Sequence, residues 1–208
     1  RQILVWTDHS LHSVQFSGAP YTFGTALLAD NIRIAGPNTA ISVNDIVFWM
    51  GQENFYVFDG RIQPLPCSVR DYVFSDLNTQ QSFKFHAGSL ASQSEVWWFY
   101  CSASSEEIDR YVIYNYAEQT WYYGTLARTA WNDRAAGSRS FPQAASTDSY
   151  LYDHEYLLDD GSQSPAIAIP AFVQSADFDI GDGDKFMLIR RILPDITFNG
   201  STDSTPAV

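Results

Sequence analysis

Four aspartates near the end of the chain have the residue type and spacing that could bind a metal ion. They are Asp177, Asp179, Asp182 and Asp184. Oxygen-rich loops with glycine turns suit Ca²⁺, but the EF-hand pattern fails because Gly181 stands where a third ligand should follow. No bidentate glutamate follows at the right distance. Two interpretations stay open, a weak Ca²⁺ site and a solvated acidic turn, and the sequence favours the turn.

Two short clusters contain the residue types of a hydrolytic or metal site. Residues Asp8 to Ser10 read Asp-His-Ser, and residues Asp153 to Glu155 read Asp-His-Glu. Members of a catalytic triad meet through folding, whereas consecutive residues in a hairpin turn point in different directions. The chain has 4 histidines and no HExxH or CxxC spacing, which disfavours a transition-metal site. Both clusters are therefore predicted to be turns, at equivalent places in two hairpins.

Glycan chemistry is the remaining possibility. A glycosidase needs two carboxylates about 5 to 10 Å apart in a cleft, and the acids available in predicted turns are Glu53, Asp59, Glu106, Glu107 and Asp109. Nothing in the sequence selects a pair among them. The aromatics that could stack on sugars are Trp97, Trp98, Trp121 and Tyr122. Because consecutive residues of a strand face opposite sides, at least half of these are predicted to be packing residues.

The charge of the chain limits its partners. The 208 residues include 12 Lys+Arg and 24 Asp+Glu, a formal net charge of −12. The lysines are Lys84 and Lys185, and no Lys or Arg lies between Ser140 and Asp184, so a surface that binds nucleic-acid phosphates is disfavoured. Arginines predicted to serve subunit contacts or internal ion pairs are Arg110, Arg128, Arg134, Arg190 and Arg191.

Two further counts bear on the class of protein. Cysteine is sparse, and Cys67 and Cys101 are predicted to be buried thiols rather than a disulfide scaffold. No stretch approaches the roughly 18 apolar residues of a membrane helix, so we expect no membrane insertion by this segment.

Nearly every element that must position these residues is predicted to be a β-strand. Short runs rich in β-branched and aromatic residues alternate with polar turns, and hairpins of this kind begin at Leu4, Val47, Val96 and Tyr150. Antiparallel hairpins at a period of about 40 to 50 residues are typical of propeller blades. An irregular β-sandwich is the alternative. The best helical candidate is 71–81.

The fold class predicted is therefore all-β, an incomplete propeller-like array of antiparallel hairpins followed by the start of a second β-element. Residues 1–161 would form the blades. Residues 162–208, with two early prolines and an apolar run after the acidic turn, would form a linker and strands of an adjoining body domain. We expect the chain to be a piece of a longer protein.

Four segments, taken in order, resemble one family of structural proteins. They are 3–24 (ILVWTDHSLHSVQFSGAPYTFG), 48–78 (FWMGQENFYVFDGRIQPLPCSVRDYVFSDLN), 94–131 (SEVWWFYCSASSEEIDRYVIYNYAEQTWYYGTLARTAW) and 178–198 (FDIGDGDKFMLIRRILPDITF). Together they are similar to the tail nozzle, tail tubular protein B-like or DNA-stabilisation proteins of short-tailed bacteriophages. Chains of that family are several times longer.

The resemblance implies a non-enzymatic virion protein without a cofactor. It would assemble in the host cytoplasm as a six-fold ring in the phage tail, below the portal and adaptor and next to fibre or spike proteins. Genome DNA would pass through without specific binding, which agrees with like-charge repulsion by a chain of net charge −12. The alternative function is a carbohydrate-binding or glycan-cleaving propeller used in host attachment.

Overall fold

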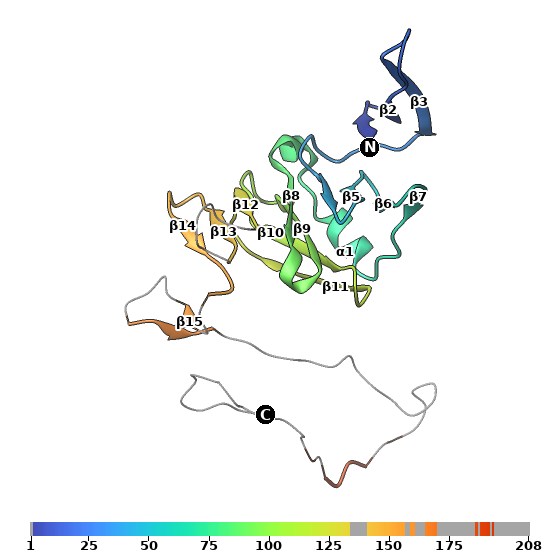
Figure 1. Cartoon of the computed structure of the whole chain (residues 1–208). Coiled ribbons are helices and arrows are strands. Elements are labelled where there is room, and N and C mark those ends of the chain that lie inside the picture. Colours follow the sequence, from blue (N-terminus) through green and yellow to red (C-terminus); the bar gives the residue numbers. More distant parts are fainter. Residues whose placement is uncertain are drawn as a thin grey trace. The chain divides into compact units, whose positions relative to one another are not determined.

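The computed structural model of the chain divides into two units, Arg1–His154 and Glu155–Val208, and Figure 1 labels strands of both. The structure describes residues 2–133, 141–156, 159–160, 165–169, 186, 188–191 and 193. The sequence analysis predicted a boundary at Gly161, and this stays a prediction because much of the chain beyond Tyr156 lies outside the described residues. Each unit is therefore treated by itself.

The first unit is built from four antiparallel sheets that follow one another along the chain. The first sheet has three strands in the order β1 (Gln2–Trp6), β2 (Ser10–Phe16) and β3 (Phe23–Asp30). The second has four, β4 (Ala40–Val43), β5 (Ile46–Met50), β6 (Phe55–Phe58) and β7 (Ile62–Pro64). The predicted all-β class is confirmed by this content, and none of the sheets closes on itself.

The third and fourth sheets repeat the up-and-down order. The third is β8 (His86–Leu90), β9 (Glu95–Tyr100), β10 (Arg110–Asn115) and β11 (Thr120–Thr125). The fourth is β12 (Ala130–Asn132), β13 (Gln143–Ala145) and β14 (Leu151–Asp153). In the second unit, β15 (Asp159–Asp160) pairs with β16 (Ile167–Ala168).

Three of the four predicted hairpins are confirmed. The hairpins at Leu4, Val47 and Val96 correspond to the pairs β1–β2, β5–β6 and β9–β10. The hairpin expected to begin at Tyr150 stays a prediction, because residues 157–158 of its second strand lie outside the described residues; within them, β14 pairs with the preceding strand β13. The strand β13 was not predicted from the sequence, because it reads Gln-Ala-Ala and lacks the aromatic residues that indicated the other strands.

The predicted helix at 71–81 is confirmed in part. The helix α1 spans Arg70–Ser75 and the 3₁₀ helix η1 spans Thr79–Lys84. Leu77 between them forms an isolated antiparallel bridge with Ser102, so the chain leaves helical geometry where it touches the third sheet. A second 3₁₀ turn, η2 (Ala91–Gln93), joins β8 to β9.

Neighbouring sheets meet along their first strands. The strand β8 of the third sheet contacts both β4 of the second and β12 of the fourth. An isolated bridge between Asn38 and His86 is parallel, so the chain enters the second and third sheets in the same direction. The first strands of three successive sheets, β4, β8 and β12, therefore lie side by side in the order in which they occur along the chain.

The main core lies between the second and third sheets. The ring of Phe55 on β6 is fully buried, and its centroid lies 4.8 Å from the ring of Trp98 and 4.8 Å from that of Trp121. The indole Nε1 of Trp98 donates a hydrogen bond to the backbone oxygen of Thr39 at 3.0 Å. Packing and a buried hydrogen bond thus join β9 to the segment that enters β4.

Smaller contacts join the outer sheets to this centre. Trp6 of β1 packs edge-on against Trp49 of β5, with ring centroids 5.6 Å apart. On the other side, Trp131 of β12 stacks on Trp97 at 5.0 Å and donates through Nε1 to the backbone oxygen of Ser89 at 2.8 Å. Aromatic side chains therefore fill each space between neighbouring sheets.

Candidate functional site

A cavity of about 350 Å³ lies where the chain enters the successive sheets. Its walls are Asn38, Phe83, Lys84, His86, Glu107, Ile108 and Thr129. Asn38 precedes β4, Lys84 and His86 flank the start of β8, and Thr129 precedes β12. The loop between β9 and β10 supplies the remaining wall, so segments far apart in the sequence converge here because the first strands are neighbours.

The charged groups of this cavity satisfy one another. The ammonium of Lys84 donates to Glu107 Oε1 at 2.7 Å and to the backbone oxygen of Glu106 at 2.7 Å. The hydroxyl of Thr129 donates to the backbone oxygen of Ala145 at 3.3 Å. The lysine and the hydroxyl therefore hold loops in place rather than point freely at a ligand.

His86 is the polar ring in the cavity wall. Its Nδ1 lies 3.4 Å from the backbone oxygen of Lys84, which can only accept, so Nδ1 carries the proton. The ring stacks on Phe99 with centroids 4.8 Å apart. Burial lowers the pKa of His86, so the imidazole is neutral at pH 7, and its Nε2 is buried without a hydrogen-bond partner. Among the described wall residues no nucleophile is paired with this imidazole.

Among the turn carboxylates considered for glycan chemistry, Asp109 is held by neighbours of its own loop. Asp109 accepts hydrogen bonds from the backbone nitrogen and hydroxyl of Ser102, at 2.7 and 2.8 Å. Arg110 Nε lies 3.4 Å from Asp76 Oδ2 and 4.0 Å from Asp109 Oδ2. This network closes the loop between β9 and β10, which favours the internal ion-pair interpretation of Arg110.

The other four acids considered for glycan chemistry make different contacts. Glu107 belongs to the ion pair with Lys84, and Glu106 contributes its backbone oxygen to the same lysine. Glu53 contributes its backbone oxygen to Arg70, and Asp59 accepts from the backbone nitrogen of Arg61. The carboxylates of Glu107 and Asp59 therefore have structural partners, whereas Glu53 and Glu106 take part through their backbone oxygens.

The two short clusters that contain a histidine, Asp8 to Ser10 and Asp153 to Glu155, differ in local structure. Asp8 and His9 form the turn between β1 and β2, where Thr7 Oγ1 accepts from the backbone nitrogen of Ser10 at 3.0 Å. The predicted turn is thereby confirmed for Asp8 and His9, whereas Ser10 already begins β2. At Asp153 to Glu155 the prediction is wrong for the first residue, because Asp153 ends β14 and pairs with Gln143.

His154 belongs to a cluster that the sequence did not indicate. Arg128 Nε donates to His154 Nε2 at 2.9 Å, and the guanidinium lies 4.2 Å from the ring centroid of Tyr152. The imidazole packs against Trp131 at 5.0 Å. Burial, together with the nearby Arg128 charge, lowers the pKa of His154 to about 4. The neutral ring is thus a hydrogen-bond acceptor that fixes the end of the fourth sheet.

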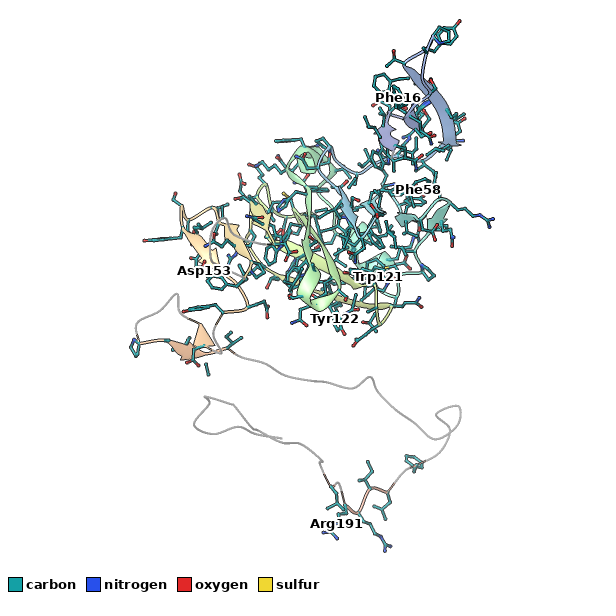
Figure 2. All side chains as sticks on the ribbon, in the orientation of Figure 1. Phe16, Phe58, Trp121, Tyr122, Asp153 and Arg191 are labelled. Atoms are coloured by element: carbon teal, nitrogen blue, oxygen red, sulfur yellow. The ribbon has the colours of Figure 1, made fainter. Side chains whose placement is uncertain are left out.

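Of the four aromatic residues considered for sugar stacking, three pack inside the protein and one remains exposed. Trp97 and Trp98 are buried. Trp121 packs on Phe55 and donates to the backbone oxygen of Pro66 at 2.8 Å. Tyr122, labelled beside Trp121 in Figure 2, remains 46% exposed. The prediction that at least half are packing residues is confirmed.

Neither cysteine has the character of a nucleophile. Cys101 is buried and Cys67 is half-buried, and both are free thiols. Burial raises the pKa of each thiol to about 11, so the reactive thiolate is scarce at pH 7. The prediction of buried thiols holds fully for Cys101 and in part for Cys67.

The Ca²⁺ candidate cannot be placed in this structure. Its residues Asp177, Asp179, Asp182 and Asp184 all lie outside the described part of the chain, so both interpretations of the run stay predictions. Within the described residues, no group of three or more His, Cys, Asp or Glu side chains comes together as metal ligands would.

Comparison with known proteins assigns the chain to no family. No protein-family model matches the sequence, and the search of curated proteins returned no relative. Among the described helices, none is both long enough and apolar enough to cross a membrane.

The cavity at the strand entries was missed by sequence reasoning. Its walls come from four separate segments, and no spacing within any one of them marks a site. The available signal was the repeat itself, since first strands of successive units tend to meet around a common axis.

Proposed function

We propose that the chain is a non-enzymatic structural component of a bacteriophage tail, built as part of a propeller-like array of β-sheets. The observation that carries this proposal is the succession of antiparallel sheets whose first strands touch in order, β4 with β8 and β8 with β12. Sheets arranged around an axis by their first strands are the plan of a propeller.

The contacts of the described residues support a rigid structural component rather than an enzyme. Glu107 and Lys84 of the cavity wall are engaged with each other, Asp109 nearby closes its own loop, and His86 in the wall is neutral. Aromatic packing between sheets gives rigidity, because rings such as Phe55 and Trp98 have no exposed surface. A rigid body without a nucleophile–base pair in its described cavity suits a conduit wall better than an enzyme.

The net negative charge of the chain supports a role as part of the wall of a DNA conduit. The chain carries a net charge of −12, and Lys84 is neutralised by Glu107. A negatively charged wall repels DNA phosphates at short range, which lets a genome pass without being held. Adaptor, portal and fibre or spike proteins would be the neighbours in a tail, and the six-fold ring stays a prediction from the family resemblance.

Fractionation of purified virions tests the proposal. We expect peptides of this chain in tails separated from capsids, in amounts comparable with those of other tail proteins by quantitative mass spectrometry. Detection in the infected-cell lysate but not in washed virions would contradict the assignment.

A carbohydrate-binding function is the second candidate, and one observation favours it. Tyr72 and Tyr123 form a ring pair with centroids 4.3 Å apart, and they are 44% and 49% exposed. Exposed aromatic faces can stack on sugar rings. A glycan array with the unmodified chain and with Tyr123→Ala would reveal such binding, and Tyr150→Ala, at a 69% exposed tyrosine, is the matched control. A reducing-sugar assay would detect cleavage, which the structural proposal does not expect.

A further inference from the structure

The first sheet has one apolar face that nothing in the described structure covers. We call it the open face; its apolar residues are Ile3, Val5, Val14, Phe16, Phe23 and Leu27, and two polar residues, His12 and Thr25, lie among them on the same side. Figure 2 labels Phe16 on this sheet. Five of the six side chains are exposed, with exposed fractions from 41% for Val5 to 72% for Phe16.

Strand register places these residues on one side. Ile3 lies opposite Val14, and Phe16 lies opposite Phe23. Side chains of directly opposed residues share a face, and so do residues two apart in a strand. The rings of Phe16 and Phe23 meet edge to face with centroids 6.1 Å apart, so the open face is a continuous surface rather than scattered side chains.

The other face of the same sheet is packed. Leu4 and Trp6 alternate with the exposed residues of β1 and contact the cluster of Leu11, Trp49 and Phe58. That cluster joins the first sheet to the second. A register slip is therefore not the reason for the exposure, because the sheet already buries one complete apolar face.

The two inner sheets show what normally covers such a face. In the second sheet, Trp49 packs towards the first sheet, while Phe48 lies 6.1 Å from Tyr114 of the third. In the third, Trp98 packs on Phe55 and Trp97 packs on Trp131 of the fourth. Each apolar sheet face within the array is covered by another sheet.

The opposite end of the array is finished differently. Asn132, Gln143 and Asp153 lie opposite one another on the outer face of the fourth sheet. Gln143 donates a hydrogen bond to the carboxylate of Asp153. The same face also carries Ala130, Ala145 and the exposed Leu151. Polar residues on an outer face help to make a terminal repeat soluble, and a face with Asp153 at its edge complements the open face less well than a second open face does, so a head-to-tail contact between copies is disfavoured.

We propose that the open face binds the open face of a second copy of this chain. The face contains no Asp, Glu, Lys or Arg, although the chain has a net charge of −12. Two such chains repel each other elsewhere, and a mostly apolar face without carboxylate, lysine or arginine side chains is where they approach with the least electrostatic cost. Because the same surface is used by both copies, the contact is isologous and closes as a two-fold pair.

The size of the face sets the strength of the pair. With about 200 Å² for a whole phenylalanine, rings that are 72% and 62% exposed offer roughly 270 Å² per copy. The aliphatic neighbours add to this, but the total stays at or below the ~800 Å² per partner of a standard interface. We therefore expect a reversible, concentration-dependent pair.

Sedimentation equilibrium or light scattering of the whole chain tests the inference. Across roughly 1 to 500 µM, a range that brackets micromolar affinity, the average mass should rise from that of one chain towards that of two. Leu27→Lys should weaken the pair at least tenfold, because it places a charge in the apolar contact. Leu151→Lys is the matched control, at a leucine of similar exposure (65% against 59%) on the polar outer face of the fourth sheet, and it should leave the mass unchanged.

The contrary outcomes are distinct. A single-chain mass at every concentration, a pair that Leu27→Lys does not weaken, or equal weakening by both variants would overturn the inference. An assembly larger than two chains would also overturn the two-fold pair, while leaving the tail function untouched. Circular dichroism checks that the variants fold, and Phe23→Lys supplies a second substitution on the same face should Leu27→Lys misfold.

Discussion

The first and third sheets contain the same kinds of side chain and bury them to opposite degrees. Phe16 in the first sheet is 72% exposed, whereas Phe99 in the third has no exposed surface. Both are phenylalanines near the C-terminal end of a strand in an antiparallel sheet. The difference lies in the neighbours, since the third sheet lies between two others and the first contacts one. Residue type therefore predicts the capacity to be buried, and the position in the array decides whether it is.

The largest expected difference between the two regions comes from removing one ring in each. Phe55→Ala removes a fully buried ring that faces the third sheet, and it should lower the free energy of unfolding by about 3–5 kcal/mol. Phe16→Ala should change it by less than about 0.5 kcal/mol in dilute solution, because the ring is already in water. Chemical denaturation followed by tryptophan fluorescence measures both. Similar losses for the two variants would show that the first sheet is covered in the isolated chain.

Glycine substitutions compare the same regions at the backbone. A Cβ at Gly88 on β8 would lie 2.5 Å from Trp131 Cδ1, so Gly88→Ala should push the fourth sheet away at a cost of about 1–3 kcal/mol. A Cβ at Gly24 on β3 would meet Ser17 at an ordinary 3.8 Å. Gly24→Ala should therefore be neutral or slightly stabilising. Hydrogen exchange should show loss of protection in β12 to β14 for the first variant alone, and unchanged protection there would contradict the packing described.

Acid should destabilise the fourth sheet through His154. His154 has a folded pKa of about 4, below its ordinary value of 6.5. The unfolded state therefore takes up the proton first, and the stability contributed by the neutral ring is lost as pH falls from 6.5 towards 4. We expect a loss of about 1 kcal/mol, because the ring is partly exposed and solvent screens its interactions.

His154→Gln gives the control for this pH effect. Glutamine keeps a hydrogen-bond acceptor for Arg128 and does not titrate, so the variant should lose less stability between pH 6.5 and 4 than the unmodified chain. His86, whose pKa burial also lowers, contributes equally to both proteins. Identical pH profiles for the two would show that His154 does not link acid to the fourth sheet.

The fold was predictable from the sequence where strands carry aromatics and failed where they do not. The runs at Val47 and Val96 gave the correct hairpins because they bury large rings on both faces. The strand Gln143–Ala145 was missed because alanines give little strand signal. Its pairing depends on Trp131 filling the space beside it, which is a tertiary contact.

The candidate site was less predictable than the fold. Local turns such as Asp8 to Ser10 follow from nearby residues and were recognised. The cavity around His86 and the contact of Arg128 with His154 join residues that are distant in the sequence. A single sequence contains no spacing that marks such contacts, so only the order of the sheets could have located them.

Localisation in the virion tests the central claim most directly. Gold-labelled antibody against this chain, applied to purified phage particles, should bind at the tail below the capsid in electron micrographs. Label that is confined to the capsid, or absent from intact particles while the same antibody detects the chain in infected-cell lysate, would contradict a structural role in the tail.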